Sequence, residues 1–279
     1  MSTRSFDPAT ICTRHRLVCL DDLSHRGSTS DLILRVQDVH GREYVLKQVG
    51  SELGESEVQA LRAWQVSCVT PRLIMELEPG YVLIEWLEGR TMAEVPRDEP
   101  APAVDIGQAL AALHRVPPPD ETPDIRSRFA LTPEAGWKLL PPSLSGLADR
   151  LATRLQHHEA RQSVFLHGDL VPANVMLSPA GPRFIDPVGR HGLPAWDLAQ
   201  LAASSLGRGR PGPLAPLLEG YGATPALLAE TFGWMILFYL QKNLALPNSS
   251  FTQHLLPVAA ALDKVGDAEW FLETCLQGV

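Results

Sequence analysis

The sequence has few cysteines and no long apolar run, and these absences restrict the class of protein. Its four cysteines form no Cys-x-x-Cys pair, which excludes the usual spacing of a zinc site and favours buried thiols in a reducing compartment. The longest apolar run, Phe232–Leu240, is too short to span a membrane. Because no apolar run follows Arg4, no signal peptide is predicted. We therefore expect a cytoplasmic protein that has no membrane partner.

Positive charge is also scarce, since 24 lysines and arginines stand against 32 aspartates and glutamates, for a formal net charge of −8. Nucleic-acid binding needs basic patches, so we expect no nucleic-acid partner. The same balance is compatible with a cationic substrate, although mild acidity is common among soluble proteins. With 279 residues, of which 45% are hydrophobic, the chain suits one large domain or two small ones.

Polar side chains suited to chemistry are concentrated between Phe165 and Pro187. Asp169, Asn174 and Asp186 lie there between short apolar runs. The runs on either side of a Ser-Pro-Ala-Gly turn predict a hairpin, which would bring Asp186 back to Asn174. An Asp and an Asn at one point offer oxygens suited to Mg²⁺, and Asp169 is left to face a substrate hydroxyl, as phosphoryl transfer requires. The alternative is a polar turn between two buried strands.

This pattern, His-Gly-Asp-x4-Asn followed by Ile-Asp, resembles the catalytic core of the aminoglycoside phosphotransferases, which are relatives of the protein kinases. The resemblance implies an α+β, bilobal protein-kinase-like fold with a small β-rich N-terminal lobe and a larger, mainly helical C-terminal lobe. We place the nucleotide-binding lobe at residues 1–86 and the catalytic and substrate-binding lobe at residues 87–279. The resemblance also implies Mg²⁺ as cofactor and ATP or GTP as co-substrate. No obligatory protein partner is predicted.

Within this resemblance each residue of the motif has a role. Asp169 is the catalytic base, and Asn174 and Asp186 hold the metal. His167 and Asp197 support the catalytic loop, with Asp197 accepting hydrogen bonds from the loop's backbone N–H groups. Because Asp197 begins a predicted helix, it is equally well interpreted as the N-cap of that helix.

Strands are expected before residue 86 and mainly helices after it, which favours a two-lobed α+β architecture. The predicted strands are 17–20, 32–39, 44–49, 72–76 and 81–85, and the predicted helices are 7–15, 54–66, 103–116, 144–156, 225–246 and 267–276.

Lys47 alternates with apolar residues on the third predicted strand, so it faces either solvent or a cleft. In the kinase-like arrangement a strand lysine binds the nucleotide phosphates, and a glutamate from a helix holds it in place. Glu57, ten residues further on, is the expected partner, and Glu55 is the alternative if the helix register differs.

Two further segments are assigned to the nucleotide through the same resemblance. The polar loop around Ser28 and Ser30 would cover the phosphates with hydroxyl and backbone N–H groups. It lacks the Gly-x-Gly-x-x-Gly pattern, and taken alone it is a solvated turn. The backbone of the hinge-like run Glu85, Trp86 and Leu87 would hydrogen-bond a purine, although an ordinary edge strand would look the same.

The chain between Asp186 and Asp197 is short. Protein kinases use a long segment here to seat a peptide, so the resemblance favours a small acceptor. Gly168 stands where protein kinases carry the arginine that binds activation-loop phosphate, which implies a constitutively active enzyme.

A nucleotide-binding pseudokinase would have lost at least one catalytic or metal-binding residue, and none of them is missing.

The run Ile185–Gly189 is most similar to the streptomycin 6-phosphotransferases, and the run Ile125–Phe129 is more loosely so. The implied acceptor is a cationic antibiotic, with streptomycin first and the tuberactinomycin peptides viomycin and capreomycin second, and the activity would give resistance.

After Pro211 the chain has six carboxylates, two lysines and no arginine, which form either an acceptor pocket or a solvated acidic face. Kinases of choline, homoserine or sugars share the motif and are the alternatives.

Overall fold

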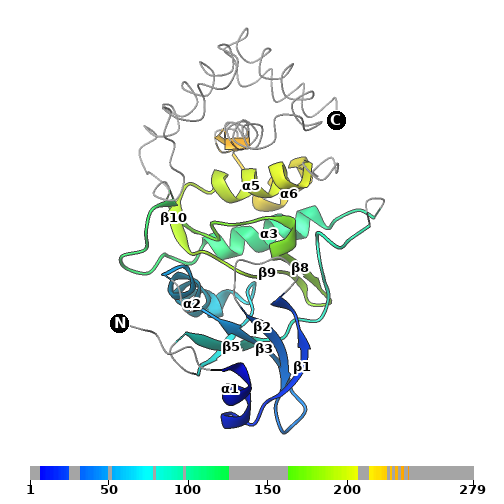
Figure 1. Cartoon of the computed structure of the whole chain (residues 1–279). Helices are drawn as coiled ribbons and strands as arrows, with labels where there is room; N and C mark the ends of the chain where they lie inside the picture. Colours follow the sequence, from blue (N-terminus) through cyan, green and yellow to red (C-terminus); the bar gives the residue numbers. More distant parts are fainter. Residues whose placement is uncertain are drawn as a thin grey trace, which may run out of the picture.

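The computed structural model describes most of the predicted N-terminal lobe and about half of the predicted C-terminal lobe. The described residues are 7–24, 32–49, 52–77, 80–96, 99–125, 163–206 and 214–224, together with Leu227, Glu230, Thr231, Trp234, Met235 and Phe238. Figure 1 shows a sheet-based lobe at one end of the molecule and a helical lobe stacked on it. The predicted two-lobed α+β architecture is therefore confirmed.

The N-terminal lobe is a five-stranded antiparallel sheet in the order β1-β2-β3-β5-β4. Its strands are β1 (Val18–Asp22), β2 (Ile33–Gln37), β3 (Glu43–Gln48), β4 (Leu73–Glu76) and β5 (Tyr81–Glu85). All five predicted strands are confirmed. Side chains alternate between the two faces of a strand, and β5 is buried on both faces, with Tyr81 and Leu83 in one cluster and Val82 and Ile84 in another.

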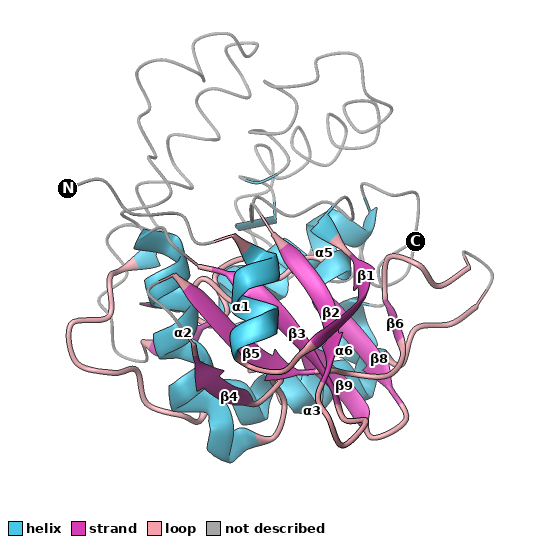
Figure 2. Ribbon diagram, turned by 60° about the horizontal axis from the view of Figure 1, so that its bottom comes forward, coloured by secondary structure: helices cyan, strands magenta, loops and turns pink. Residues whose placement is uncertain are grey.

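One helix covers each face of this sheet (Figure 2). Helix α1 (Pro8–Arg14) places Ile11 and Cys12 against Tyr81 and Leu83. Helix α2 (Glu52–Trp64) places Val58 and Leu61 against Val82 and Ile84. Both helices were predicted, and the sandwiched strand β5 explains why its apolar run is continuous rather than alternating.

In the described part of the C-terminal lobe, three α-helices and two small sheets precede Pro225. The helices are α3 (Ala103–His114), α5 (Ala195–Leu206) and α6 (Leu214–Tyr221), and the strands are β6 (Arg90–Thr91), β7 (Val164–Leu166), β8 (Val175–Ser178), β9 (Gly181–Phe184) and β10 (Arg190–Gly192). The β8–β9 hairpin pairs with β6, and β10 pairs antiparallel with β7. These short strands bring the two halves of the predicted catalytic motif together.

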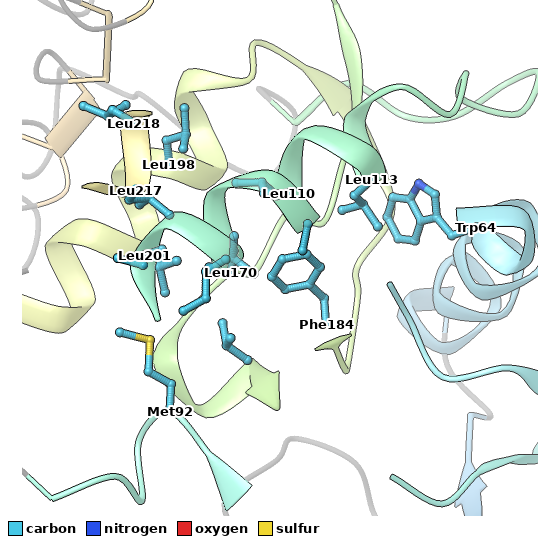
Figure 3. Packing of buried hydrophobic residues seen from close by; sticks show 14 of the residues in the cluster. Trp64, Met92, Leu110, Leu113, Leu170, Phe184, Leu198, Leu201, Leu217 and Leu218 are labelled. Atoms are coloured by element: carbon cyan, nitrogen blue, oxygen red, sulfur yellow. The ribbon is translucent and has the colours of Figure 1, made fainter. Parts of the chain in front are cut away.

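Helix α2 also belongs to the core of the C-terminal lobe. Its Ala60 and Trp64 are fully buried in that core, and the ring of Trp64 lies 4.2 Å from the ring of Phe165, centroid to centroid. Figure 3 shows Trp64 beside Leu113 of α3. The predicted boundary at residue 86 stays a prediction, but one helix before it packs on both lobes.

Helices α3 and α6 approach each other closely through two glycines. A Cβ atom on Gly107 would lie 2.2 Å from the carbonyl oxygen of Leu217, and one on Gly220 would lie 2.1 Å from that of Val104. Neither position has room for a methyl group, because real Cβ atoms do not come this close to backbone oxygen. Glycine therefore sets the distance between these two helices.

The remaining predicted helices lie in the C-terminal lobe, and the structure describes some of them fully, some in part and some not at all. The helix predicted at 103–116 is confirmed as α3, and the six described residues after Pro225 are all helical. The helices predicted at 144–156 and 267–276 lie outside the described residues. Within the part of the chain that the structure describes, none of the helices is long and apolar enough to cross a membrane.

Candidate active site

The β8–β9 hairpin places Asn174 and Asp186 at adjacent strand ends, as predicted from the sequence. Val175 lies opposite Phe184 in the register, and just beyond this pair the Ile185 N–H donates to the carbonyl of Asn174 at 3.0 Å. Asp186 has a φ of +56°, in the left-handed region that Asp adopts more readily than most residues. The two side chains predicted to bind a metal therefore share one end of a hairpin.

Asp169 is held by two side-chain amides. Asn174 Nδ2 donates to the backbone carbonyl of Asp169 at 2.8 Å, and Gln200 Nε2 donates to its carboxylate Oδ1 at 2.9 Å. Because Asn174 uses its amide nitrogen here, its Oδ1 is left as an acceptor or metal ligand. Asp169 is half-buried, so part of its surface is accessible from solvent.

Asp197 anchors the backbone of the catalytic loop. Its Oδ2 accepts from the His167 N–H at 2.7 Å, and its Oδ1 accepts from the Gly168 N–H at 3.0 Å. Helix α5 begins at Ala195, so Asp197 is the third residue of the helix and the N-cap interpretation is wrong. Asp197 is fully buried, and its charge is compensated by these donors and by His114 Nε2 at 3.1 Å.

The same carboxylate connects the loop to α6 through His114. The other ring nitrogen of His114, Nδ1, lies 2.9 Å from the hydroxyl of Tyr221. Burial, followed by the charge of Asp197, raises the pKa of Tyr221, so its hydroxyl keeps the proton. In the neutral tautomer with the proton on Nε2, His114 accepts from Tyr221 and donates to Asp197.

His167 shapes the loop from within. Its Nε2 lies 2.9 Å from the carbonyl of Ile185, and its Nδ1 accepts from the Asp169 N–H at 3.3 Å. These partners assign the proton to Nε2, and burial lowers the pKa of His167, which keeps the ring neutral. Gly168 follows with a φ of +80°, a conformation that favours glycine.

Lys47 lies between two carboxylates. Its Nζ is 2.8 Å from both carboxylate oxygens of Glu57 and 2.8 Å from Asp186 Oδ1, so the structure brings Glu57 to the lysine rather than Glu55. Burial opposes the charge of Lys47, but the attraction of Glu57 and Asp186 outweighs it and raises the pKa of Lys47. Burial also raises the pKa of Glu57 to about 7, against the attraction of Lys47.

The hinge-like run is partly used by the sheet. The Glu85 N–H donates to the Arg72 carbonyl at 2.9 Å, and the Glu85 carboxylate accepts from Arg183 Nη2 at 3.1 Å. The role of Glu85, Trp86 and Leu87 in binding a purine stays a prediction.

Of the remaining residues predicted to bind the nucleotide, the structure describes Trp86 and Leu87 but not Ser28 and Ser30. The guanidinium carbon of Arg35 lies 4.4 Å from the ring centroid of Trp86, a cation–π contact that fixes this side chain beside the hinge. Leu87 is buried. Ser28 and Ser30 lie outside the described residues, so their phosphate-binding role stays a prediction.

Three residues of the site were missed by sequence reasoning: Gln200, His114 and Tyr221. Gln200 follows Asp197 by three residues on one helix, so both lie on the same helix face, and that spacing is a usable signal. His114 and Tyr221 gave no signal, because their partnership depends on how α3 packs against α6.

The site has the donor set that a magnesium ion needs. Asn174 Oδ1 and the Asp186 carboxylate are hard oxygen ligands, and Mg²⁺ commonly takes few protein ligands beside phosphate oxygens and water. The residues present therefore fit the ion.

Together, the fold and this site define a kinase-like phosphotransferase. A model of the phosphotransferase enzyme family matches residues 24–231, and because this is most of the chain, the protein belongs to the phosphotransferase enzyme family. No significant match was found among curated proteins.

Several solved structures share the fold at low sequence identity. An aminoglycoside phosphotransferase from Alicyclobacillus acidocaldarius is 16% identical, with 99% of this chain and 97% of that chain covered and a TM-score of 0.65. A choline/ethanolamine kinase family protein from Mesorhizobium loti is also 16% identical, with 94% and 92% covered and a TM-score of 0.62. A macrolide 2′-phosphotransferase from Brachybacterium faecium is 17% identical, with 92% and 98% covered and a TM-score of 0.58. The predicted protein-kinase-like fold is thereby confirmed.

Proposed function

We propose that this protein is a Mg²⁺-dependent O-phosphotransferase that moves the γ-phosphate of ATP or GTP to a hydroxyl of a small cationic antibiotic and so gives resistance. The observation that supports phosphoryl transfer is one continuous set of hydrogen bonds. Lys47 bonds to Asp186, the neighbouring Ile185 bonds to Asn174, and Asn174 bonds to Asp169. The proposed phosphate-binding, metal-binding and base residues are thus linked within one site.

Each of these residues has a distinct task in the proposed reaction. Asp169 orients the acceptor hydroxyl and takes its proton as the oxygen attacks the γ-phosphorus and the bond to the nucleoside diphosphate breaks. Lys47 binds the nucleotide phosphates, and Asn174 and Asp186 would hold Mg²⁺, which neutralises phosphate charge when bound. Rate enhancement in such a site comes mainly from positioning and charge neutralisation.

The segment after Asp186 supports a small acceptor. It forms β10, which pairs with β7, and then enters α5 at Ala195. The eight residues from Pro187 to Pro194 are therefore taken up by the scaffold of the site, and a long platform that could seat a peptide substrate does not fit between these elements.

A cationic antibiotic is supported by the formal net charge of −8 and by the similarity of the run Ile185–Gly189 to the streptomycin 6-phosphotransferases. Streptomycin is the first candidate, and capreomycin and viomycin are the second. The fold shared with a choline/ethanolamine kinase family protein favours a small metabolite with a cationic group as the alternative acceptor.

The test is a transfer assay with the purified protein, Mg²⁺ and either ATP or GTP. Streptomycin, capreomycin, choline and a neutral sugar are offered separately, and the phosphorylated product is identified by mass spectrometry. We expect product with at least one of the two antibiotics. Product with choline alone would move the assignment to the small-metabolite alternative.

Asp169→Asn should lower kcat by about 10²–10⁴-fold while leaving nucleotide affinity nearly unchanged, because the base is needed only for the acceptor. Asparagine keeps an oxygen for the hydrogen bond from Gln200, so the loop should keep its shape. Asp105→Asn, at an exposed position of α3, is the matched control and should behave as the wild type. More than about a tenth of wild-type kcat in Asp169→Asn would remove Asp169 from the role of base.

A further inference from the structure

We propose that Gln200 positions the catalytic base, because its side-chain amide donates to the Asp169 carboxylate and selects the carboxylate oxygen that meets the acceptor hydroxyl. The inference rests on the proposed function, since it takes Asp169 as the base. It adds a residue to the site that lies on α5, outside the catalytic loop itself.

Helix α5 holds the catalytic loop with two side chains one turn apart. Asp197 accepts from the N–H groups of His167 and Gly168, and Gln200 Oε1 accepts from the Leu170 N–H at 3.0 Å. The N–H of the residue between them, Asp169, donates to His167 Nδ1. Four consecutive backbone N–H groups therefore end on side-chain acceptors, and the loop geometry depends on those side chains.

The orientation of the Gln200 amide follows from its two partners. The Leu170 N–H is a donor, so it must face the amide oxygen. The amide nitrogen is then turned to Asp169 Oδ1, which lies 2.9 Å away and can accept. A flipped amide would place donor against donor and acceptor against acceptor, so the partners fix the assignment.

This bond restricts the side chain that does the chemistry. The last torsion of an aspartate is broad, so a free carboxylate would present either oxygen at a range of angles. With Oδ1 bound to Gln200, Oδ2 is left for the acceptor hydroxyl. A base displaced by about 1 Å can lose about 10²-fold in rate, and a donor on a helix holds its geometry better than one on a loop.

A purely structural role would need only the bond from Leu170 to Gln200, and two variants separate the possibilities. Gln200→Glu keeps an oxygen for the Leu170 N–H but replaces the donor with a carboxylate beside Asp169. Gln200→Met has a similar length and removes both hydrogen bonds. Gln108→Glu makes the same chemical change at an exposed position of α3 and is the matched control.

The kinetic test uses Mg²⁺–ATP and streptomycin. Gln200→Glu should lower kcat by about 10–100-fold near pH 8 while the KM for ATP stays within about twofold. The ratio of its kcat to that of the wild type should rise as the pH falls, because the introduced carboxyl gains a proton to donate. Gln200→Met should show the loss without this recovery. A kcat near that of the wild type in Gln200→Glu, or a loss that is the same at every pH, would overturn the proposal.

Crystal structures of the wild type and the two variants give a readout that needs no turnover. In both variants the Asp169 carboxylate should leave its wild-type position, while the hydrogen bonds that Asp197 accepts from the N–H groups of His167 and Gly168 persist. An Asp169 carboxylate that keeps its position in both variants would contradict the inference. Failure of the wild-type protein to phosphorylate streptomycin would instead count against the proposed substrate, and the crystallographic result would still decide the role of Gln200.

Discussion

At Lys47 one ammonium group is bound by two carboxylates, those of Glu57 and Asp186. Their different burial affects the pKa values of this group of residues. Lys47 and Glu57 are both buried, whereas Asp186 is partly exposed. Burying ionised groups costs free energy even when they are paired, and the deeper carboxylate bears that cost. Burial therefore raises the pKa of Glu57, whereas burial lowers the pKa of Lys47 but is outweighed by the attraction of the two carboxylates, so both shifts are upward although the charges are opposite.

A prediction for stability follows from Glu57. Its pKa is about 7 in the folded protein against an ordinary value of 4.5, so between these values the folded state holds a proton that the unfolded state releases. The contribution of Glu57 to the free energy of unfolding is therefore complete below about pH 4.5 and is lost as the pH rises through about 7. Lys47 stays protonated throughout this range.

The variant Glu57→Gln, which cannot titrate, isolates this effect. Urea unfolding at several pH values between about 4.5 and 8 should show that the stability of the wild type relative to the variant decreases as the pH rises. Glu55→Gln, at an exposed position two residues earlier on the same helix, is the control and should leave the pH dependence of the wild type intact. A relative stability that increases with pH would show that the attraction of Lys47 outweighs burial.

Individual site residues differ in how well the sequence could predict them. Asp169, Asn174 and Asp186 could be placed because their relation depends on one loop and one short hairpin. Glu57 could be predicted as the partner of Lys47, but Glu55 remained an alternative because the register of the helix determines which of the two glutamates faces the lysine. Gln200 was not predicted, since its two contacts are with a loop about thirty residues earlier in the chain.

Helices α3 and α6 make a contact that a single added methyl group would disturb. Gly107→Ala would place a methyl group 2.2 Å from the Leu217 carbonyl oxygen, so the helices must separate. Overpacking of this kind costs about 1–3 kcal/mol of unfolding free energy. The separation would also disturb Tyr221, which ends α6 and bonds to His114.

We therefore expect Gly107→Ala to lower both the urea midpoint and kcat, while Gln108→Ala, at the neighbouring exposed position, changes neither. Equilibrium unfolding and kcat with Mg²⁺–ATP are the measurements. Wild-type stability in Gly107→Ala would mean that α6 moves away without cost, and the close approach would then have no energetic importance.

Element boundaries limited the sequence prediction at Asp197. The N-cap interpretation failed because α5 begins two residues earlier, after Pro194, which suits a helix start. As the third residue of the helix, Asp197 still lies in the first turn, where a negative charge is favourable. Its carboxylate is turned to the catalytic loop, and local sequence cannot distinguish a cap from such a tertiary contact.

Several contacts join the two lobes of the whole molecule next to the site. Arg183 donates to the Thr70 carbonyl at 2.9 Å, and the Phe184 N–H donates to the Val69 carbonyl at 2.8 Å. Arg190 donates to Ser56 at 3.0 Å, one residue before Glu57. Helix α2 is thus tied to the segment that follows Asp186 through Arg190 and Ser56, and the constitutive activity stays a prediction.

The charge of the whole chain gives the last prediction, which concerns the acceptor. Six carboxylates and two lysines follow Pro211; Glu219 and Glu230 belong to the described residues, and the other four carboxylates lie outside them. A pocket lined by carboxylates would attract a guanidinylated antibiotic, and salt would screen that attraction. A solvated acidic face away from the acceptor would leave the KM for the acceptor insensitive to salt.

We expect the KM for streptomycin, at saturating Mg²⁺–ATP, to rise about fivefold between about 20 mM and about 500 mM KCl, because the Debye length falls from about 20 Å to about 4 Å over this range. The KM for ATP is titrated separately, since the anionic nucleotide meets Lys47 and has a salt dependence of its own. If a neutral sugar is also phosphorylated, its KM is the internal control and should stay nearly constant. An equal salt response for streptomycin and the sugar would place the acidic residues away from the acceptor, because screening then acts on the enzyme as a whole. Turnover confined to the neutral sugar would refute the cationic-antibiotic proposal, while the phosphotransferase fold and its catalytic loop would still account for the reaction.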